Sequence, residues 1–231
     1  MVHEGQEYSV FCLHHVPGTW DHVRVKELIG DRDGDAKYFS IVRDPVDLFI
    51  SMWDYYDFSG TLKMDLETFA MNTSMAFKRR MGRRARGQAG YNMMLFDFGL
   101  PLGSLDNESA VVAMIAQIES NFDLIMVMEQ FDESLLLLRE LMCWEWDDMV
   151  YLKLNSQQKT KQSKLSPDGR AILKMFLKSD YLLYDHFKKR FQDTLRKYAG
   201  DVEHDLRLLR SLNGDIKMDC VKVLCNNHLI K

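Results

Sequence analysis

An arginine and a serine eight residues apart lie where they could bind an anion, in the segment KYFSIVRDPVDLFISMWDYY (residues 37–56). Arg43 follows a nearly continuous apolar run at 38–42, which is typical of a strand buried on both faces. Asp44 is a favourable N-cap and Pro45 suits the first helical position. The sequence therefore predicts a strand, a tight turn and a helix. Arg43 would then lie at the carboxyl end of a sheet, where open α/β folds bind ligands.

The predicted helix has an apolar face with i, i+3, i+4, i+7 spacing, made by Val46, Phe49, Ile50 and Trp53. Ser51 points roughly to the opposite side. A helix N-terminus favours anions, an arginine supplies two parallel donors to a phosphate, and a hydroxyl adds a directional donor. Arg43 could equally be a surface loop residue and Ser51 a solvated helix position. This segment alone leaves both interpretations open.

Three further segments have the composition of short buried strands: EYSVFCLHHV (7–16), FDLIMVM (122–128) and DMVYLKLN (148–155). The strand in the first of these segments is predicted to end at His14 and His15, and Glu129 lies just past the end of the second segment. His14 and Glu129 are thus predicted at strand ends, where α/β sheets place their ligands.

Helical patterns alternate with these strands. We expect a helix over 62–77, one capped by Asn107, one capped by Asp132, and helical structure from Ser166 to about Leu212. An apolar run at 91–100 contains the polar residues Asn92 and Asp97. The order of strands and helices predicts an α/β fold with a mainly parallel sheet and a helical C-terminal third.

Composition limits the function classes. The 231 residues suit one domain, and a net charge of -4 does not favour nucleic-acid or membrane binding. The four cysteines show no metal-ligand spacing, so we expect no metal site. A run of six basic residues lies between Lys78 and Arg86. It is either a solvated loop or a loop that faces an anion, and without an accompanying reading motif we expect no nucleic-acid partner.

The segment YFSIVRDPVDLFISMWDYY resembles the 3′-phosphate-binding motif of sulfotransferases. The flanking segments resemble one branch, the galactose 3-O-sulfotransferase family, which includes galactosylceramide sulfotransferase. The matching segments, in order, are FCLHH, NMMLFDFGL, FDLIMVMEQFDESLLLLRELMCWEWDDMVYLKLN and KLSPDGRAILKMFLKSDYLLYDHFKKRF. The resemblance covers roughly residues 8–210.

The resemblance implies a P-loop NTPase-like three-layer sandwich. It also implies transfer of a sulfuryl group from 3′-phosphoadenylyl sulfate (PAPS) to the 3-hydroxyl of galactose on glycolipids or glycoproteins, with no metal. Arg43 and Ser51 match the residues that bind the donor's 3′-phosphate. His14 matches a family histidine that could act as base, or else is a packed strand-end residue. Asn92, Asp97 and Glu129 are candidates for bonding sugar hydroxyls, although Asp97 and Glu129 could instead cap helices or brace loops.

The sequence also departs from the family pattern. The family's lysine-bearing loop for the 5′-phosphosulfate and its membrane anchor precede the segment FCLHH, and neither is found in residues 1–231. Gln157 stands where family members often have arginine, so no phosphate contact is assigned there. We expect a sulfotransferase domain at 1–215 without its donor-loop segment, a tail at 216–231, and little activity from the chain alone. The full-length family member is expected on the lumenal side of the Golgi membrane. The alternative is a non-catalytic nucleotide- or glycan-binding remnant.

Overall fold

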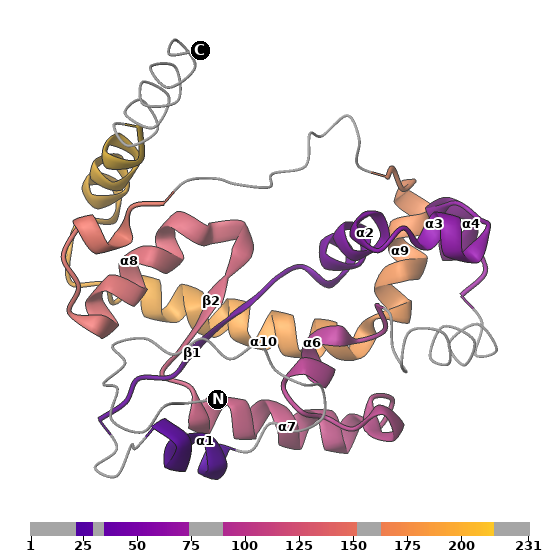
Figure 1. Cartoon of the computed structure of the whole chain (residues 1–231), viewed down its shortest axis with the longest axis horizontal. Coiled ribbons are helices and arrows are strands. Elements are labelled where there is room, and N and C mark those ends of the chain that lie inside the picture. The colour runs from indigo at the N-terminus through magenta and orange to yellow at the C-terminus, as the bar shows by residue number, and fades with distance from the viewer. Residues whose placement is uncertain (1–21, 30–34, 74–89, 152–162, 215–231) are drawn as a thin grey trace, which may run out of the picture.

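Two parallel strands run side by side through the middle of the molecule in the computed structural model, which describes residues 22–29, 35–73, 90–151 and 163–214 (Figure 1). The strands are β1 (Phe39–Val42) and β2 (Leu124–Val127), paired in the register Phe39↔Leu124 to Val42↔Val127. All four residues of β2 are buried. The strands expected within 38–42 and 122–128 are therefore confirmed, as is their parallel direction. The predicted burial of the first strand on both faces is wrong, because Ile41 is 38% exposed and Phe39 and Ser40 are half-buried.

The Asp123 side chain extends the strand pairing at the end where both strands begin. The backbone N–H of Tyr38 donates to the Asp123 side chain at 2.8 Å, and the N–H of Asp123 donates to the Tyr38 carbonyl at 2.8 Å. Both residues lie one position before their strands. The pairing therefore continues past the regular strands through a side chain.

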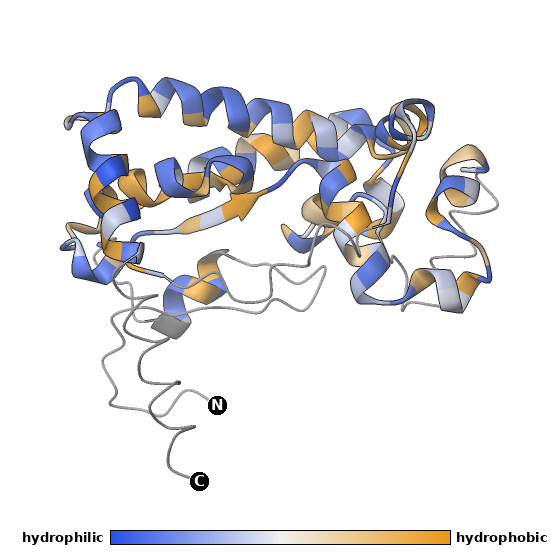
Figure 2. Ribbon diagram, turned by 90° about the horizontal axis from the view of Figure 1, so that it is seen from above, coloured by the Kyte–Doolittle hydropathy of each residue, from blue (hydrophilic) through white to orange (hydrophobic). Residues whose placement is uncertain are grey.

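Helices pack against β2, and the side chains buried between the elements are mainly apolar (Figure 2). Among the described residues, the α-helices are α1 (His22–Ile29), α2 (Pro45–Tyr55), α3 (Phe58–Leu62), α4 (Leu66–Met71), α6 (Met93–Asp97), α7 (Glu108–Asn121), α8 (Phe131–Met142), α9 (Pro167–Phe176) and α10 (Lys178–Leu195), and residues 202–214 are also helical. Short 3₁₀ turns are η1 (Leu102–Ser104), η2 (Met128–Gln130) and η3 (Asp147–Met149).

The helix starts follow the expected capping chemistry at three positions. The Asp44 side chain accepts hydrogen bonds from the N–H groups of Val46 and Asp47 at the start of α2. Asn107 caps α7 and Ser166 caps α9 in the same manner. These local signals confirm the predicted starts of α2, α7 and α9.

The core is formed largely around α10, which packs against β2 and against α2, α6, α7, α8 and α9. A second part of the core is aromatic. Phe49 and Trp53 of α2 pack against Phe69 of α4 with ring centroids 5.3 and 5.0 Å away, and Phe176 of α9 meets Phe49 edge-on. This cluster fixes α2 against α4 and α9.

Three other local predictions were wrong. The expected helix at 62–77 is broken, because Lys63 adopts a left-handed conformation (φ 57°) that ends α3, and α4 begins only at Leu66. Asp132 does not cap α8, whose N-cap is Gln130. It lies in the first turn and instead accepts hydrogen bonds from Tyr151 and Arg210.

The predicted strand at 148–155 is the third error, as far as the described residues extend. Residues 147–149 form the turn η3, and the backbone N–H of Tyr151 donates to the side chain of Asn213 at 2.8 Å rather than to a neighbouring strand. A side-chain partner thus replaces the strand ladder. The described part of the chain is a helix-rich α/β structure with one parallel strand pair. The expected strand at 7–16 lies outside the described residues.

Candidate functional site

Arg43 and Ser51 occupy the positions that their spacing predicts. Arg43 is the first residue after β1, and Ser51 lies two turns into α2. Both are half-buried. Within the described residues, the structure shows no hydrogen bond or ion pair for the Arg43 guanidinium or the Ser51 hydroxyl. No described residue therefore competes with an anionic ligand for these donor groups.

The segment 163–170 lies along the same face of α2 as Ser51. Asp47 and Asp54 are the i−4 and i+3 neighbours of Ser51 on this helix. Asp54 accepts hydrogen bonds from the Ser163 N–H at 3.0 Å and hydroxyl at 2.5 Å, while Asp47 pairs with Arg170 at 2.7 Å. Ser51 is thus flanked on both sides by contacts to this segment.

Arg170 brings a second cation to the start of α2. Its Nη2 atom lies 2.7 Å from Asp47 and 3.9 Å from Asp44, and its side chain is 44% exposed. Two carboxylates next to Arg43 would repel a phosphate, and Arg170 offsets their charge. Sequence reasoning missed this residue, because its partner Asp47 is 123 positions away.

Glu129 lies at the same end of the sheet as Arg43, as the strand pattern predicts. Its Oε1 atom accepts a hydrogen bond from the backbone N–H of Asp44 at 2.8 Å, and its Oε2 atom accepts one from the Tyr184 hydroxyl at 3.1 Å. The Asp44 carboxylate in turn accepts from the Tyr181 hydroxyl at 3.0 Å. These contacts support the alternative in which Glu129 braces a loop. Sugar binding by Glu129 stays a prediction.

Both tyrosines are largely buried, on α10. Burial, followed by the neighbouring carboxylates, raises the pKa of Tyr181 and of Tyr184 above the ordinary value. Each phenol therefore stays protonated and donates its hydrogen bond throughout the physiological range. The turn at Arg43 is held by two neutral donors from one rigid helix.

Asn92 has no exposed surface. It precedes α6 in a left-handed conformation (φ 47°), and its side-chain oxygen accepts from the backbone N–H of Asp180 at 3.1 Å. The Asp180 carboxylate accepts from the N–H groups of Met94 and Leu95 at 3.1 and 3.0 Å. This reciprocal pair joins α6 to α10, which gives Asn92 a structural role in this arrangement. Sugar binding by Asn92 gains no support from it.

Asp97 is exposed at the end of α6, so contact with a sugar stays a prediction for this residue. His14 and the basic run 78–86 lie outside the described residues. Across the described ranges, no group of three or more His, Cys, Asp or Glu side chains is arranged to hold a metal ion. None of the helices in those ranges is long and apolar enough to cross a membrane.

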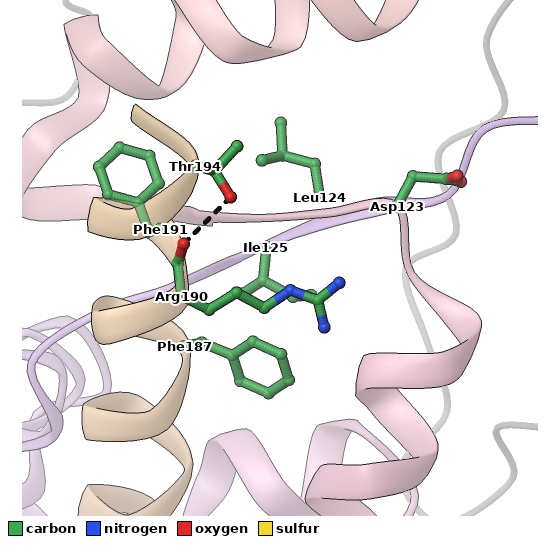
Figure 3. Close-up of a pocket in the computed structure, with 7 residues that line it drawn as sticks. All are labelled: Asp123, Leu124, Ile125, Phe187, Arg190, Phe191 and Thr194. Atoms are coloured by element: carbon green, nitrogen blue, oxygen red, sulfur yellow. Dashed lines mark hydrogen bonds between the residues drawn. The ribbon is translucent and has the colours of Figure 1, made fainter. Parts of the chain in front are cut away.

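A small hollow lies at the opposite end of β2 from Glu129 (Figure 3). Its lining is Asp123, Leu124, Ile125, Phe187, Arg190, Phe191 and Thr194. The Arg190 side chain that crosses it is already paired with Glu119 at 2.5 Å. The hollow contains none of the predicted site residues, so we place the candidate site at the carboxyl end of the strands.

Comparison with known proteins gives a consistent family assignment. The galactose-3-O-sulfotransferase family model matches residues 2–230. Human galactose-3-O-sulfotransferase 2 is 31% identical over 224 residues, covering 94% of this chain and 54% of the relative. The pig protein of the same name is 29% identical, covering 96% and 56%. Human galactosylceramide sulfotransferase is 30% identical, covering 94% and 51%.

The chain spans about half the length of these curated relatives. No solved structure matches it. The family model nevertheless extends over nearly every residue, including the strand, turn and helix that present Arg43 and Ser51. The chain therefore belongs to the galactose-3-O-sulfotransferase family.

Proposed function

We propose that this chain forms the donor 3′-phosphate site of a galactose 3-O-sulfotransferase that uses PAPS. The observation that carries the proposal is the placement of Arg43 and Ser51. The strand β1 ends just before the arginine, a capped helix presents the serine, and neither donor group has a partner among the described residues. A planar guanidinium and a hydroxyl suit a dianionic phosphate.

In the proposed reaction, the 3-hydroxyl oxygen of galactose attacks the sulfur of PAPS in line with the leaving phosphate. The new oxygen–sulfur bond forms as the sulfur–oxygen bond to the 5′-phosphate breaks, releasing adenosine 3′,5′-bisphosphate. A general base accepts the hydroxyl proton. His14 is the proposed base. Arg43 and Ser51 fix the far end of the donor, which orients the sulfur for attack.

The charges around the turn support an anionic ligand. Arg170 offsets the negative charge of Asp44 and Asp47, so the Arg43 guanidinium is not committed to either carboxylate. Asp44 is further engaged by Tyr181 and by its own cap to α2. The arginine therefore keeps its donors for the ligand.

The acceptor, the location and the complete fold are parts of the same proposal. The relatives' names include galactosylceramide sulfotransferase, which supports a galactose-terminated glycolipid or glycoprotein as acceptor. We propose the lumenal side of the Golgi membrane as the site of action. The parallel strand pair supports a P-loop NTPase-like three-layer fold for the complete domain.

Isothermal titration calorimetry with adenosine 3′,5′-bisphosphate tests the donor site. Arg43→Ala should weaken binding by ~1.5–3 kcal/mol, the range for hydrogen bonds to charged groups. Ser51→Ala should weaken it by about 0.5–1.5 kcal/mol, because its hydroxyl is neutral. Adenosine 5′-phosphate, which lacks the 3′-phosphate, should bind the wild type and Arg43→Ala equally.

Arg207→Ala is the matched control, since Arg207 is 67% exposed and lies in the helical residues 202–214 away from the turn. It should leave the affinity unchanged. Equal bisphosphate affinity for the wild type and Arg43→Ala would remove Arg43 from the donor site.

A further inference from the structure

We propose that Glu129 is a positioning residue for donor binding. Its carboxylate fixes the main-chain turn that presents Arg43, and it does not bond the galactose acceptor. The donor half of this inference rests on the proposed function. The bracing of the turn rests on contacts within the chain.

The strand register explains why Glu129 meets this turn. The pairs from Phe39↔Leu124 to Val42↔Val127 share one sequence offset, and the bond from the Asp44 N–H to Glu129 keeps that offset of 85 residues. After Val127 the main chain turns away into η2. The Glu129 side chain therefore takes the place of the next backbone acceptor in the parallel ladder.

The bonded group is the peptide that joins Arg43 to Asp44. Its N–H belongs to Asp44, but its plane is set by the backbone of Arg43. A hydrogen bond of 2.8 Å to Glu129 therefore fixes the direction in which the chain leaves β1. The same bond fixes where the Arg43 side chain starts.

The brace is itself anchored to the core. Tyr184 is 3% exposed, and its hydroxyl donates to the second oxygen of Glu129 at 3.1 Å. Tyr181, three residues earlier on α10, holds the Asp44 carboxylate. Two bonds aim the Glu129 carboxylate at the turn and at α10. The turn that carries Arg43 is thus hydrogen-bonded, through Asp44 and Glu129, to two side chains of the buried helix α10.

The test uses the full chain with Glu129→Ala, Glu129→Gln and Tyr184→Phe. Glu140→Ala, an exposed carboxylate on α8, is the matched control. The first readout is hydrogen exchange of the Asp44 amide without ligand. The second is calorimetric affinity for adenosine 3′,5′-bisphosphate, and the third is affinity for methyl β-galactoside.

Glu129→Ala should speed exchange of the Asp44 amide and weaken bisphosphate binding by about 3- to 10-fold, the factor for one net hydrogen bond. Methyl β-galactoside affinity should not change. Glu129→Gln should restore both properties, because its amide oxygen accepts from Asp44 and its NH₂ group donates to Tyr184. Tyr184→Phe should give the same changes as Glu129→Ala, but smaller.

One outcome would overturn the bracing role of Glu129, a second would overturn only the proposed donor site, and the two are distinguishable. Loss of galactoside affinity in Glu129→Ala with unchanged exchange at Asp44 would make Glu129 a sugar ligand. Faster exchange at Asp44 in Glu129→Ala, with no bisphosphate binding by the wild type, would sustain the brace. That result would refute the donor site itself.

Discussion

Asp180 is a fully buried carboxyl at the junction of α6 and α10. Burial raises its pKa from 3.8 to about 7, despite the opposing hydrogen bonds from the N–H groups of Leu95 and Met94, and the charge of Asp97 raises it further. The folded protein therefore binds the Asp180 proton more tightly than the unfolded chain does. Protonation state and folding are linked at this one residue.

The sign of the effect follows from that pKa. The folded-state value lies above the unfolded value, so the stabilisation is fully present below pH 3.8 and is lost as the pH rises through about 7. Each pKa unit corresponds to about 1.4 kcal/mol, so a shift of about three units gives roughly 4 kcal/mol at most. As the pH rises from 5 to 8, the contribution of Asp180 to the free energy of unfolding falls by about 2–3 kcal/mol.

The assay is urea unfolding of the wild type and of Asp180→Asn at several pH values from about 5 to 8. The asparagine carries no titrating charge, and its oxygen can still accept from one of the two N–H groups. We expect the wild type to lose stability relative to Asp180→Asn as the pH rises. Asp185→Asn, an exposed change on the same helix, should run parallel to the wild type. Parallel curves for the wild type and Asp180→Asn would refute the reasoning.

Three further predictions concern stability. Trp53→Ala should lower the free energy of unfolding by about 3–5 kcal/mol, because the side chain is fully buried among aromatic rings; a loss below about 1 kcal/mol in urea would contradict that packing. Gly90→Ala should lower the thermal midpoint, because φ is 88° and the added Cβ would lie 2.5 Å from the Phe49 ring; an unchanged midpoint would exclude this crowding. Asn107→Ala should lower the free energy of unfolding by about 1 kcal/mol, whereas Asn107→Ser should retain the cap; equal stability of the two variants would count against the bond to Ala110.

The sequence predicted those elements whose signals are local. The strand before Arg43, the cap at Asp44 and the proline at the first helical position lie within a few residues of one another. The predicted strand at 148–155 failed, over its described residues 148–151, for the opposite reason. Its apolar composition fits a strand, but the partner of the Tyr151 N–H is Asn213, 62 residues away. Composition alone cannot identify such a partner.

In the candidate site too, the residues that share a local segment could be predicted, and those from distant segments could not. Arg43 and Ser51 share one strand, turn and helix, so their spacing was enough to place them together. Arg170 and Tyr184 reach the turn from distant helices, through partners 123 and 55 positions away, and no spacing rule connects them. Asn92 shows that a polar residue in an apolar run can be misinterpreted. A polar residue in an apolar run suggests a ligand contact, but burial with a backbone partner explains it here.

The offset of 85 residues between β1 and β2 also has a consequence for biosynthesis. A ribosome adding about 5–20 residues per second needs roughly 4–17 s after making Asp44 before it makes Glu129. During that interval β1 has no β2 to pair with, and loop-closure entropy opposes the long-range contact. Tyr181 follows later still, 137 residues after Asp44. The arginine turn is therefore made early in translation but reaches its final geometry only after α10 has been synthesised. Slow elongation between β1 and β2 would lengthen the time for which the unpaired β1 is exposed to chaperones.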